Sequence, residues 1–153
     1  MKHVTAEELQ NVAVIHPDQR RPPMTRAERL ERWAELLQKH AERRLSPLEG
    51  TEFQRRQVRD QMRSINSPIS VAANDPILRA EGLTGDTYGE ARRSFELPDR
   101  QLHEIVCYCH AGDSMSGHRA ERWVRAAIAK PPHTGLWGRL RSALGMIGYR
   151  ARQ

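Results

Sequence analysis

The stretch from Leu102 to Ile128, LHEIVCYCHAGDSMSGHRAERWVRAAI, decides the fold that the sequence predicts. Apolar residues recur at helical spacing before Gly112 and again after it, and Lys130-Pro131-Pro132 stops the second helix. Gly112 suits the position just past a helix end, where a positive φ favours glycine. Two apolar stripes joined by a short turn should close on each other. We therefore expect a central antiparallel helical hairpin over about residues 98–130, in which Trp123 faces the first stripe.

Start signals for further helices recur along the chain. Thr25-Arg26-Ala27-Glu28 is a capping box, and the apolar face after it predicts a helix over residues 26–44. A second helix should run from Thr51 to about Ile65. Three more helix starts follow. Two are a capping residue followed by proline, Ser67-Pro68 and Asp75-Pro76, and the third is a capping box, Thr87-Tyr88-Gly89-Glu90. No segment alternates apolar and polar residues over a useful length, so we expect no β-sheet. The predicted fold class is all-α, a small irregular bundle of five or six helices.

The predicted bundle, residues 24–130, is flanked by two segments of different composition. Residues 1–23 form an N-terminal arm with a short helix and a proline-rich linker, and residues 131–153 form a cationic amphipathic segment. Residues 1–121 hold 18 basic and 19 acidic side chains, a net charge of −1, whereas residues 122–153 hold seven basic and no acidic ones. The net charge of +6 therefore lies at the C-terminal end. A negatively charged partner should meet that end.

Composition also indicates a compartment. No apolar run approaches the roughly 18 residues that span a bilayer. Acidic residues follow the first methionine where a signal peptide would be apolar. Cys107 and Cys109 are one residue apart and would point to different sides of a helix, which argues against a disulfide between them and suits a reducing compartment. We expect a cytoplasmic protein.

One cluster has the spacing of a metal site. His103, Cys107 and His110 follow each other at i, i+4 and i+7, so on a helix they point to one side. Histidine nitrogen and cysteine thiolate are ligands for zinc or a related ion. His118 or Asp113 would close the site from across the turn. Because no second CxxC or HxxxH strengthens the pattern, a half-buried helix flank is the favoured interpretation, and no cofactor is expected.

Four arginines follow Phe53, and three of them, Arg55, Arg59 and Arg63, are spaced at i,i+4. Such a ridge can bind a phosphate or carboxylate. The alternative is a solvated helix side that Glu52 and Asp60 partly neutralise, and we favour it.

Catalysis and DNA binding both lack supporting patterns. Cys107 has neighbouring histidines, but neither an oxyanion-binding loop nor an orienting third residue stands out, so we expect no enzyme. Residues 88–105 partly match a helix-turn-helix. However, Arg92 lies where a small side chain is needed, and Glu96 replaces the usual turn glycine. The second helix would begin Asp99-Arg100-Gln101, a poor charge pattern for phosphates, and sequence-specific DNA binding is not expected.

The C-terminal segment is the predicted contact surface. On a helix, residues 136–152 form one apolar stripe bordered by arginines. The residues expected to contact a partner are Leu136, Trp137, Arg139, Leu140, Arg141, Leu144 and Ile147. Three surfaces fit this stripe: the bundle itself, a groove on a protein partner or an anionic membrane. We expect a non-catalytic interaction module that docks on a protein, with a metal-binding or nucleic-acid-binding regulator as the alternative; self-association is compatible with either.

Overall fold

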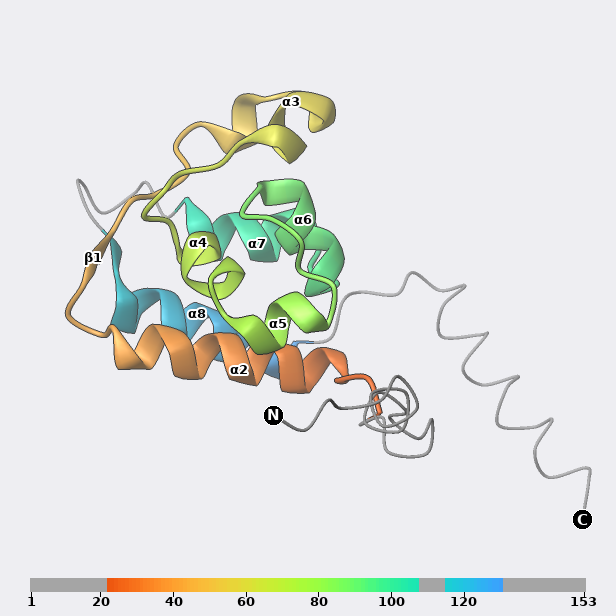
Figure 1. Cartoon of the computed structure of the whole chain (residues 1–153). Helices are drawn as coiled ribbons and strands as arrows, with labels where there is room; N and C mark the ends of the chain where they lie inside the picture. The colour runs from red at the N-terminus through yellow and green to blue at the C-terminus, as the bar shows by residue number, and fades with distance from the viewer. Residues whose placement is uncertain (1–21, 108–114, 131–153) are drawn as a thin grey trace, which may run out of the picture.

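The computed structural model describes residues 22–107 and 115–130 of the 153-residue chain (Figure 1). The predicted all-α class is confirmed, because helices dominate these residues and the sheet has only two short strands. The elements in chain order are α2 (Arg26–Lys39), β1 (Arg44–Leu45), the 3-10 helix η2 (Thr51–Phe53), α3 (Arg56–Gln61), α4 (Pro68–Ala73), α5 (Pro76–Ala80), α6 (Tyr88–Ser94), α7 (Asp99–Val106), β2 (Met115–Ser116) and α8 (Gly117–Ala129). Residues 1–21 of the predicted arm, Gly112 and the segment 131–153 lie outside the described residues.

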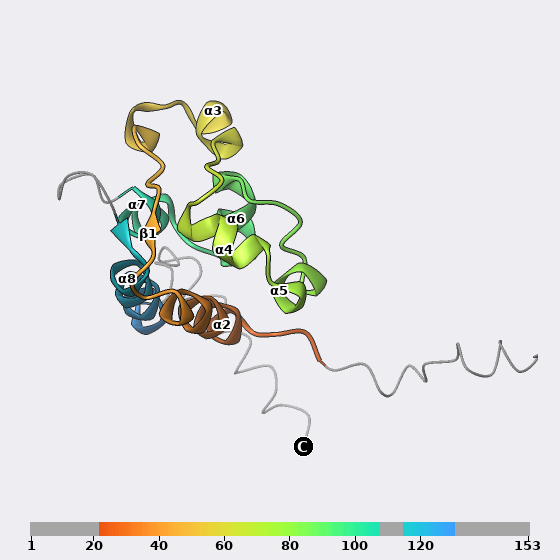
Figure 2. The same cartoon turned by 60° about the vertical axis from the view of Figure 1, so that its left-hand side comes forward.

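Helices α2 and α8 lie side by side along one face of the molecule (Figures 1 and 2). They run antiparallel. At one end Arg26 donates from Nη2 to the carbonyl of Ala127 at 3.2 Å, and at the other the amide of Gly117 donates to the carbonyl of Arg43 at 3.0 Å. The predicted hairpin of α7 with α8 is not confirmed, since α8 makes its most extensive contact with α2. The longer apolar stripe of α2 offers α8 more surface to bury than the two turns of α7 do.

The prediction that the chain forms no sheet is wrong. β1 pairs with β2 antiparallel, with Leu45 opposite Met115, and both of these side chains are buried. Two-residue strands are too short to produce the period-two alternation by which a strand is recognised. The strand also shortens the helix predicted over residues 26–44, because α2 ends at Lys39 and the chain then turns into β1.

The local start signals are confirmed. Ser67 accepts a hydrogen bond from the amide of Ser70, and Thr87 accepts one from the amide of Glu90. Proline occupies the first turn of both α4 and α5. The helix predicted from Thr51 to Ile65 is replaced by η2 and the six-residue α3, which buries no residue. Sparse apolar positions leave this segment without the face that would hold a longer helix on the core.

Trp33 is at the centre of the core. Its side chain is completely buried and stacks on the ring of Phe95 with 4.4 Å between the centroids. Its Nε1 donates to the carbonyl of Pro68 at 2.9 Å. One side chain of α2 thus joins α4 and the end of α6. The other large, fully buried side chains are Tyr88, Leu30, Leu37, Leu45, Ile69, Leu78, Leu83, Leu102, Ile105 and Val106.

An ion pair of the buried Asp75 with the partly exposed Arg32 joins α2 to the start of α5. Arg32 donates from Nη2 to Asp75 Oδ2 at 2.7 Å, and Asp75 Oδ1 accepts from the amides of Ile77 and Leu78. Burial by itself raises the pKa of Asp75, but the hydrogen bonds from Arg32 and the two amides outweigh it. The pKa of Asp75 therefore lies below its ordinary value.

This ion pair predicts an acid-dependent loss of stability. Because the folded-state pKa of Asp75 is below its unfolded-state pKa of about 3.9, ionised Asp75 stabilises the fold. This stabilisation is complete above about pH 3.9 and is lost as the pH falls through the folded-state pKa. Asp75→Asn should therefore reduce the free energy of unfolding at pH 7 by about 1–3 kcal/mol and make its decline toward pH 3 shallower. Urea unfolding at several pH values measures both effects. Equal acid sensitivity in wild type and variant would contradict the prediction; Asp86→Asn, at a more exposed pair with Arg63, is the control.

Candidate metal centre and the exposed protrusion

Residues 50–65 form a protrusion that carries η2 and α3, and its two ends are held together at a neck. The amide of Ser46 donates to the carbonyl of Asn66 at 2.7 Å, and Asn66 Nδ2 donates to the carbonyl of Arg44 at 2.7 Å. Figures 1 and 2 show α3 on the side of the molecule away from α2 and α8. We call this segment the α3 protrusion.

Ion pairs attach the C-terminal half of the α3 protrusion to α6 and α7. Arg59 donates to Asp99 at 2.7 Å, and Arg92 donates to Asp60 at 2.8 Å. A Cβ added at Gly89 would lie 2.8 Å from the Cβ of Asp60, so α3 approaches α6 more closely than a larger residue allows. Part of the arginine ridge therefore binds carboxylates of this chain. Glu52, expected to neutralise the ridge, contacts α7 instead.

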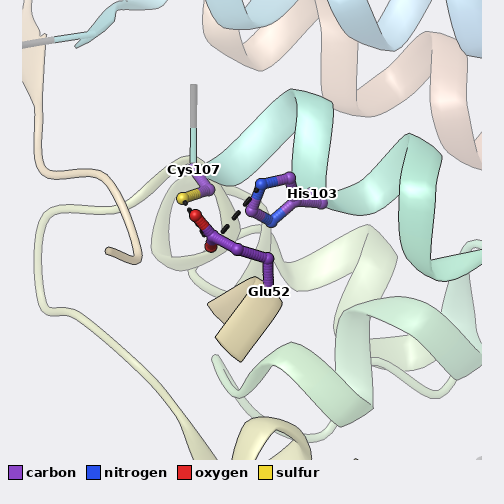
Figure 3. Close-up of side chains that lie close together, drawn as sticks. All are labelled: Glu52, His103 and Cys107. Carbon is purple, nitrogen blue, oxygen red and sulfur yellow. Dashed lines mark hydrogen bonds and ion pairs between the residues drawn. The ribbon is translucent and has the colours of Figure 1, made fainter. Parts of the chain in front are cut away.

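The N-terminal half of the α3 protrusion brings Glu52 against α7, where three potential metal ligands converge (Figure 3). Glu52 Oε2 lies 3.6 Å from His103 Nε2 and 3.6 Å from Cys107 Sγ. The three ligand atoms are all within 4.8 Å of one another. The backbone holds this approach, because the amide of Leu48 donates to the carbonyl of Val106 at 2.8 Å and so joins the segment before η2 to the end of α7.

A buried hydroxyl orients the histidine of this cluster. Thr51 Oγ1 lies 2.7 Å from His103 Nδ1, and Thr51 is completely buried. When Thr51 accepts from Nδ1–H, the lone pair of Nε2 faces the carboxylate of Glu52. Metal-binding histidines are commonly fixed in this way by a hydrogen bond to the second ring nitrogen.

Cys107 is buried and disulfide-bonded. The expectation that the two cysteines do not pair rested on a helix that continues through both residues, whereas α7 ends at Val106 with Cys107 as its C-cap. A disulfide sulfur carries no proton, so its 3.6 Å approach to Glu52 is a contact and not a hydrogen bond in this state.

The structure unites two of the predicted ligands with one that the sequence did not indicate. His103 and Cys107 share one side of α7 as their i,i+4 spacing predicts, and Glu52 completes the cluster. His118 is not among these ligands; it is exposed on α8 and lies 3.7 Å from Glu121. His110 and Asp113 lie outside the described residues, as do the predicted contact residues Leu136, Trp137, Arg139, Leu140, Arg141, Leu144 and Ile147.

The turn between α6 and α7 forms without the glycine that a helix-turn-helix usually has there. Glu96, between α6 and α7, adopts a left-handed backbone with φ of 50° although it is not glycine. Arg29 holds this turn by donating to the carbonyl of Ser94 at 2.7 Å and to Glu96 Oε1 at 2.5 Å. The missing glycine therefore does not exclude the turn. The other two observations against DNA binding are unchanged: Arg92 lies where a small side chain is needed, and Asp99, Arg100 and Glu104 give α7 a net charge of −1, which does not suit phosphates.

Comparison of the chain with protein-family models, with curated proteins and with solved structures gives no match. Among the described residues, no helix combines the length and apolar character needed to cross a membrane.

Proposed function

We propose that this chain is a non-catalytic interaction module and that the α3 protrusion docks on an acidic protein surface. The observation that carries this proposal is the exposure of its large apolar side chains. Phe53, Val58 and Ile65 are 83%, 51% and 88% exposed. They are three of the four large hydrophobic residues exposed within residues 22–107 and 115–130, the fourth being Ile77 on α5.

These side chains are not part of the hydrophobic core. Isolated apolar residues on a surface are ordinary, but a concentration of them on one short segment is typical of binding sites. The neck at Ser46 and the ion pair of Arg59 with Asp99 hold the segment in place. A partner would therefore meet an ordered surface, which reduces the entropy lost on docking.

The charge of the α3 protrusion selects the kind of partner. Residues 50–65 contain four arginines and two carboxylates, a net charge of +2. Arg55, Arg56 and Arg63 are exposed beside the apolar residues. The predicted second contact, residues 136–152, is also apolar and cationic, so the two surfaces should repel each other and share an acidic partner. An acidic surface with an apolar groove has the complementary chemistry.

Partner capture with a matched variant tests the proposal. Phe53→Ser combined with Ile65→Ser should leave the free energy of unfolding within about 0.5 kcal/mol of wild type, since both side chains are exposed. The partner retained by the full-length wild-type chain should be identified, purified and titrated against both proteins. Its affinity should be at least tenfold weaker for the double variant and should fall as salt is raised.

Ile77→Ser, at the exposed apolar residue of α5, is the control and should bind like wild type. Equal affinity for wild type and the double variant would exclude the α3 protrusion as the docking surface. A high ratio of absorbance at 260 to 280 nm in the purified wild type would instead favour nucleic acid as the ligand.

A further inference from the structure

We propose that Glu52, His103 and Cys107 form a binding site for zinc or a similar divalent transition-metal ion, and that the site is available only when Cys107 is reduced. The three side chains supply oxygen, nitrogen and sulfur ligands from η2 and α7 (Figure 3). This set suits zinc, which binds all three ligand types. The proposal is independent of the docking function.

The two separations from Glu52 suit an ion placed between the ligands, and the third pair, His103 with Cys107, lies within 4.8 Å. At 3.6 Å, Glu52 Oε2 is too far from His103 Nε2 for a direct hydrogen bond. A tetrahedral zinc ion with ordinary bond lengths holds its oxygen and nitrogen ligands about 3.4 Å apart and its oxygen and sulfur ligands about 3.6 Å apart. Both Glu52 distances, 3.6 Å to Nε2 and 3.6 Å to Sγ, are close to these values.

The residues around the cluster favour a metal site over polar groups that are close together by chance. Thr51 is buried and positions the ring of His103 through Nδ1, so Nε2 faces the other two ligands. Cys107 is fully buried, whereas Glu52 and His103 are about one-third exposed, at 33% and 28% of their side chains. An ion can therefore enter from the Glu52 side, and three protein ligands leave a fourth position for water.

The disulfide of Cys107 makes the site depend on redox state. A dithiol reductant transfers two electrons and two protons, which converts the protein disulfide into two thiols while the reductant becomes a disulfide. The Cys107 thiol then loses its proton to solvent as the sulfur binds the ion, because only the thiolate is a strong ligand. In the oxidised protein Cys107 Sγ is part of a disulfide and cannot become a thiolate. Only Glu52 and His103 then remain as ligands.

Metal titration of the full chain tests both parts of the proposal. Metal-free protein, kept reduced with a phosphine, should bind one equivalent of Zn²⁺ by calorimetry. With Co²⁺ it should give the visible absorption of a tetrahedral site and a thiolate charge-transfer band. Glu52→Gln and His103→Gln should each weaken binding at least tenfold, and Cys107→Ser should remove the charge-transfer band. Oxidised wild type should bind at least tenfold more weakly than the reduced protein.

Two further variants distinguish this site from others. Thr51→Val keeps the side-chain volume but removes the hydroxyl, and should weaken Zn²⁺ binding about 10–100-fold with the Co²⁺ thiolate band retained. Cys109→Ser removes the only other cysteine, so this variant should bind Zn²⁺ without reductant. His118→Ala, at an exposed histidine outside the cluster, should bind like wild type.

Three results would overturn the proposal. If the folded, reduced wild-type chain binds no Zn²⁺, the three side chains do not form a metal site. Binding that survives both Glu52→Gln and His103→Gln would place the ion elsewhere. Equal binding by oxidised and reduced wild type would remove the redox dependence. None of these results bears on docking by Phe53 and Ile65.

Discussion

Trp33→Ala should lower the free energy of unfolding by about 3–5 kcal/mol. The side chain is completely buried between α2, α4 and α6, so its loss leaves a cavity that rigid helices cannot fill. The carbonyl of Pro68 also loses its donor. A domain of this size has only about 5–15 kcal/mol of stability in total, and the variant should be close to unfolding at 37 °C. Urea unfolding followed by circular dichroism measures the effect independently of tryptophan fluorescence.

Trp33→Phe separates the two contributions. It keeps an aromatic ring against Phe95 but cannot donate to Pro68, and should cost about 1–3 kcal/mol. Trp123→Ala is the second comparison. Because Trp123 is only partly buried, this substitution should lower the free energy of unfolding by less than Trp33→Ala does. A loss below 1 kcal/mol for Trp33→Ala would mean that Trp33 is not at the centre of the core.

Gly117→Ala should be the most damaging glycine-to-alanine change among the glycines that the structure describes, at about 3 kcal/mol. A Cβ at this position would lie 2.2 Å from the carbonyl oxygen of His40 and 2.9 Å from that of Leu37. Both are backbone atoms at the end of α2, so no side chain can turn aside. Relief requires α8 to move away from α2, which also disturbs the pairing of β1 with β2.

Thermal unfolding of Gly117→Ala and Gly85→Ala forms the matched experiment. A Cβ at Gly85 would meet only the Cγ of Glu90, at an ordinary 3.6 Å, so this variant should melt within a few degrees of wild type. Equal melting temperatures for the two variants would show that α2 and α8 do not approach at Gly117 as closely as described.

The sequence predicted most reliably what depends on neighbouring residues. The capping by Ser67, Asp75 and Thr87 is encoded within three or four positions, and each starts a helix where expected. His103 and Cys107 share a face because they are one helical turn apart. These features need no knowledge of the tertiary fold.

Features that join distant segments could not be found in this way. Glu52 reaches His103 and Cys107 across more than 50 positions, and its own neighbours in the sequence indicate only a charged helix side. The pairing of α8 is a similar case. Its apolar stripe fits both α7 and α2, and periodicity identifies an apolar face without identifying what covers it. The two-residue strands leave no pattern at all.

The antiparallel pair of α2 and α8 has a consequence for biosynthesis. The hydrogen bond of Arg26 with Ala127 joins residues 101 positions apart, so α2 leaves the ribosome well before α8, its main neighbour. From the end of α2 at Lys39 to the end of α8 at Ala129 the ribosome adds 90 residues, which takes about 5–20 s at ordinary elongation rates. During that interval α2 lacks the helix with which it makes its most extensive contact. The nascent chain therefore exposes apolar surface of the kind that chaperones bind, and the contact of α2 with α8 is a non-local one of the kind that slows folding.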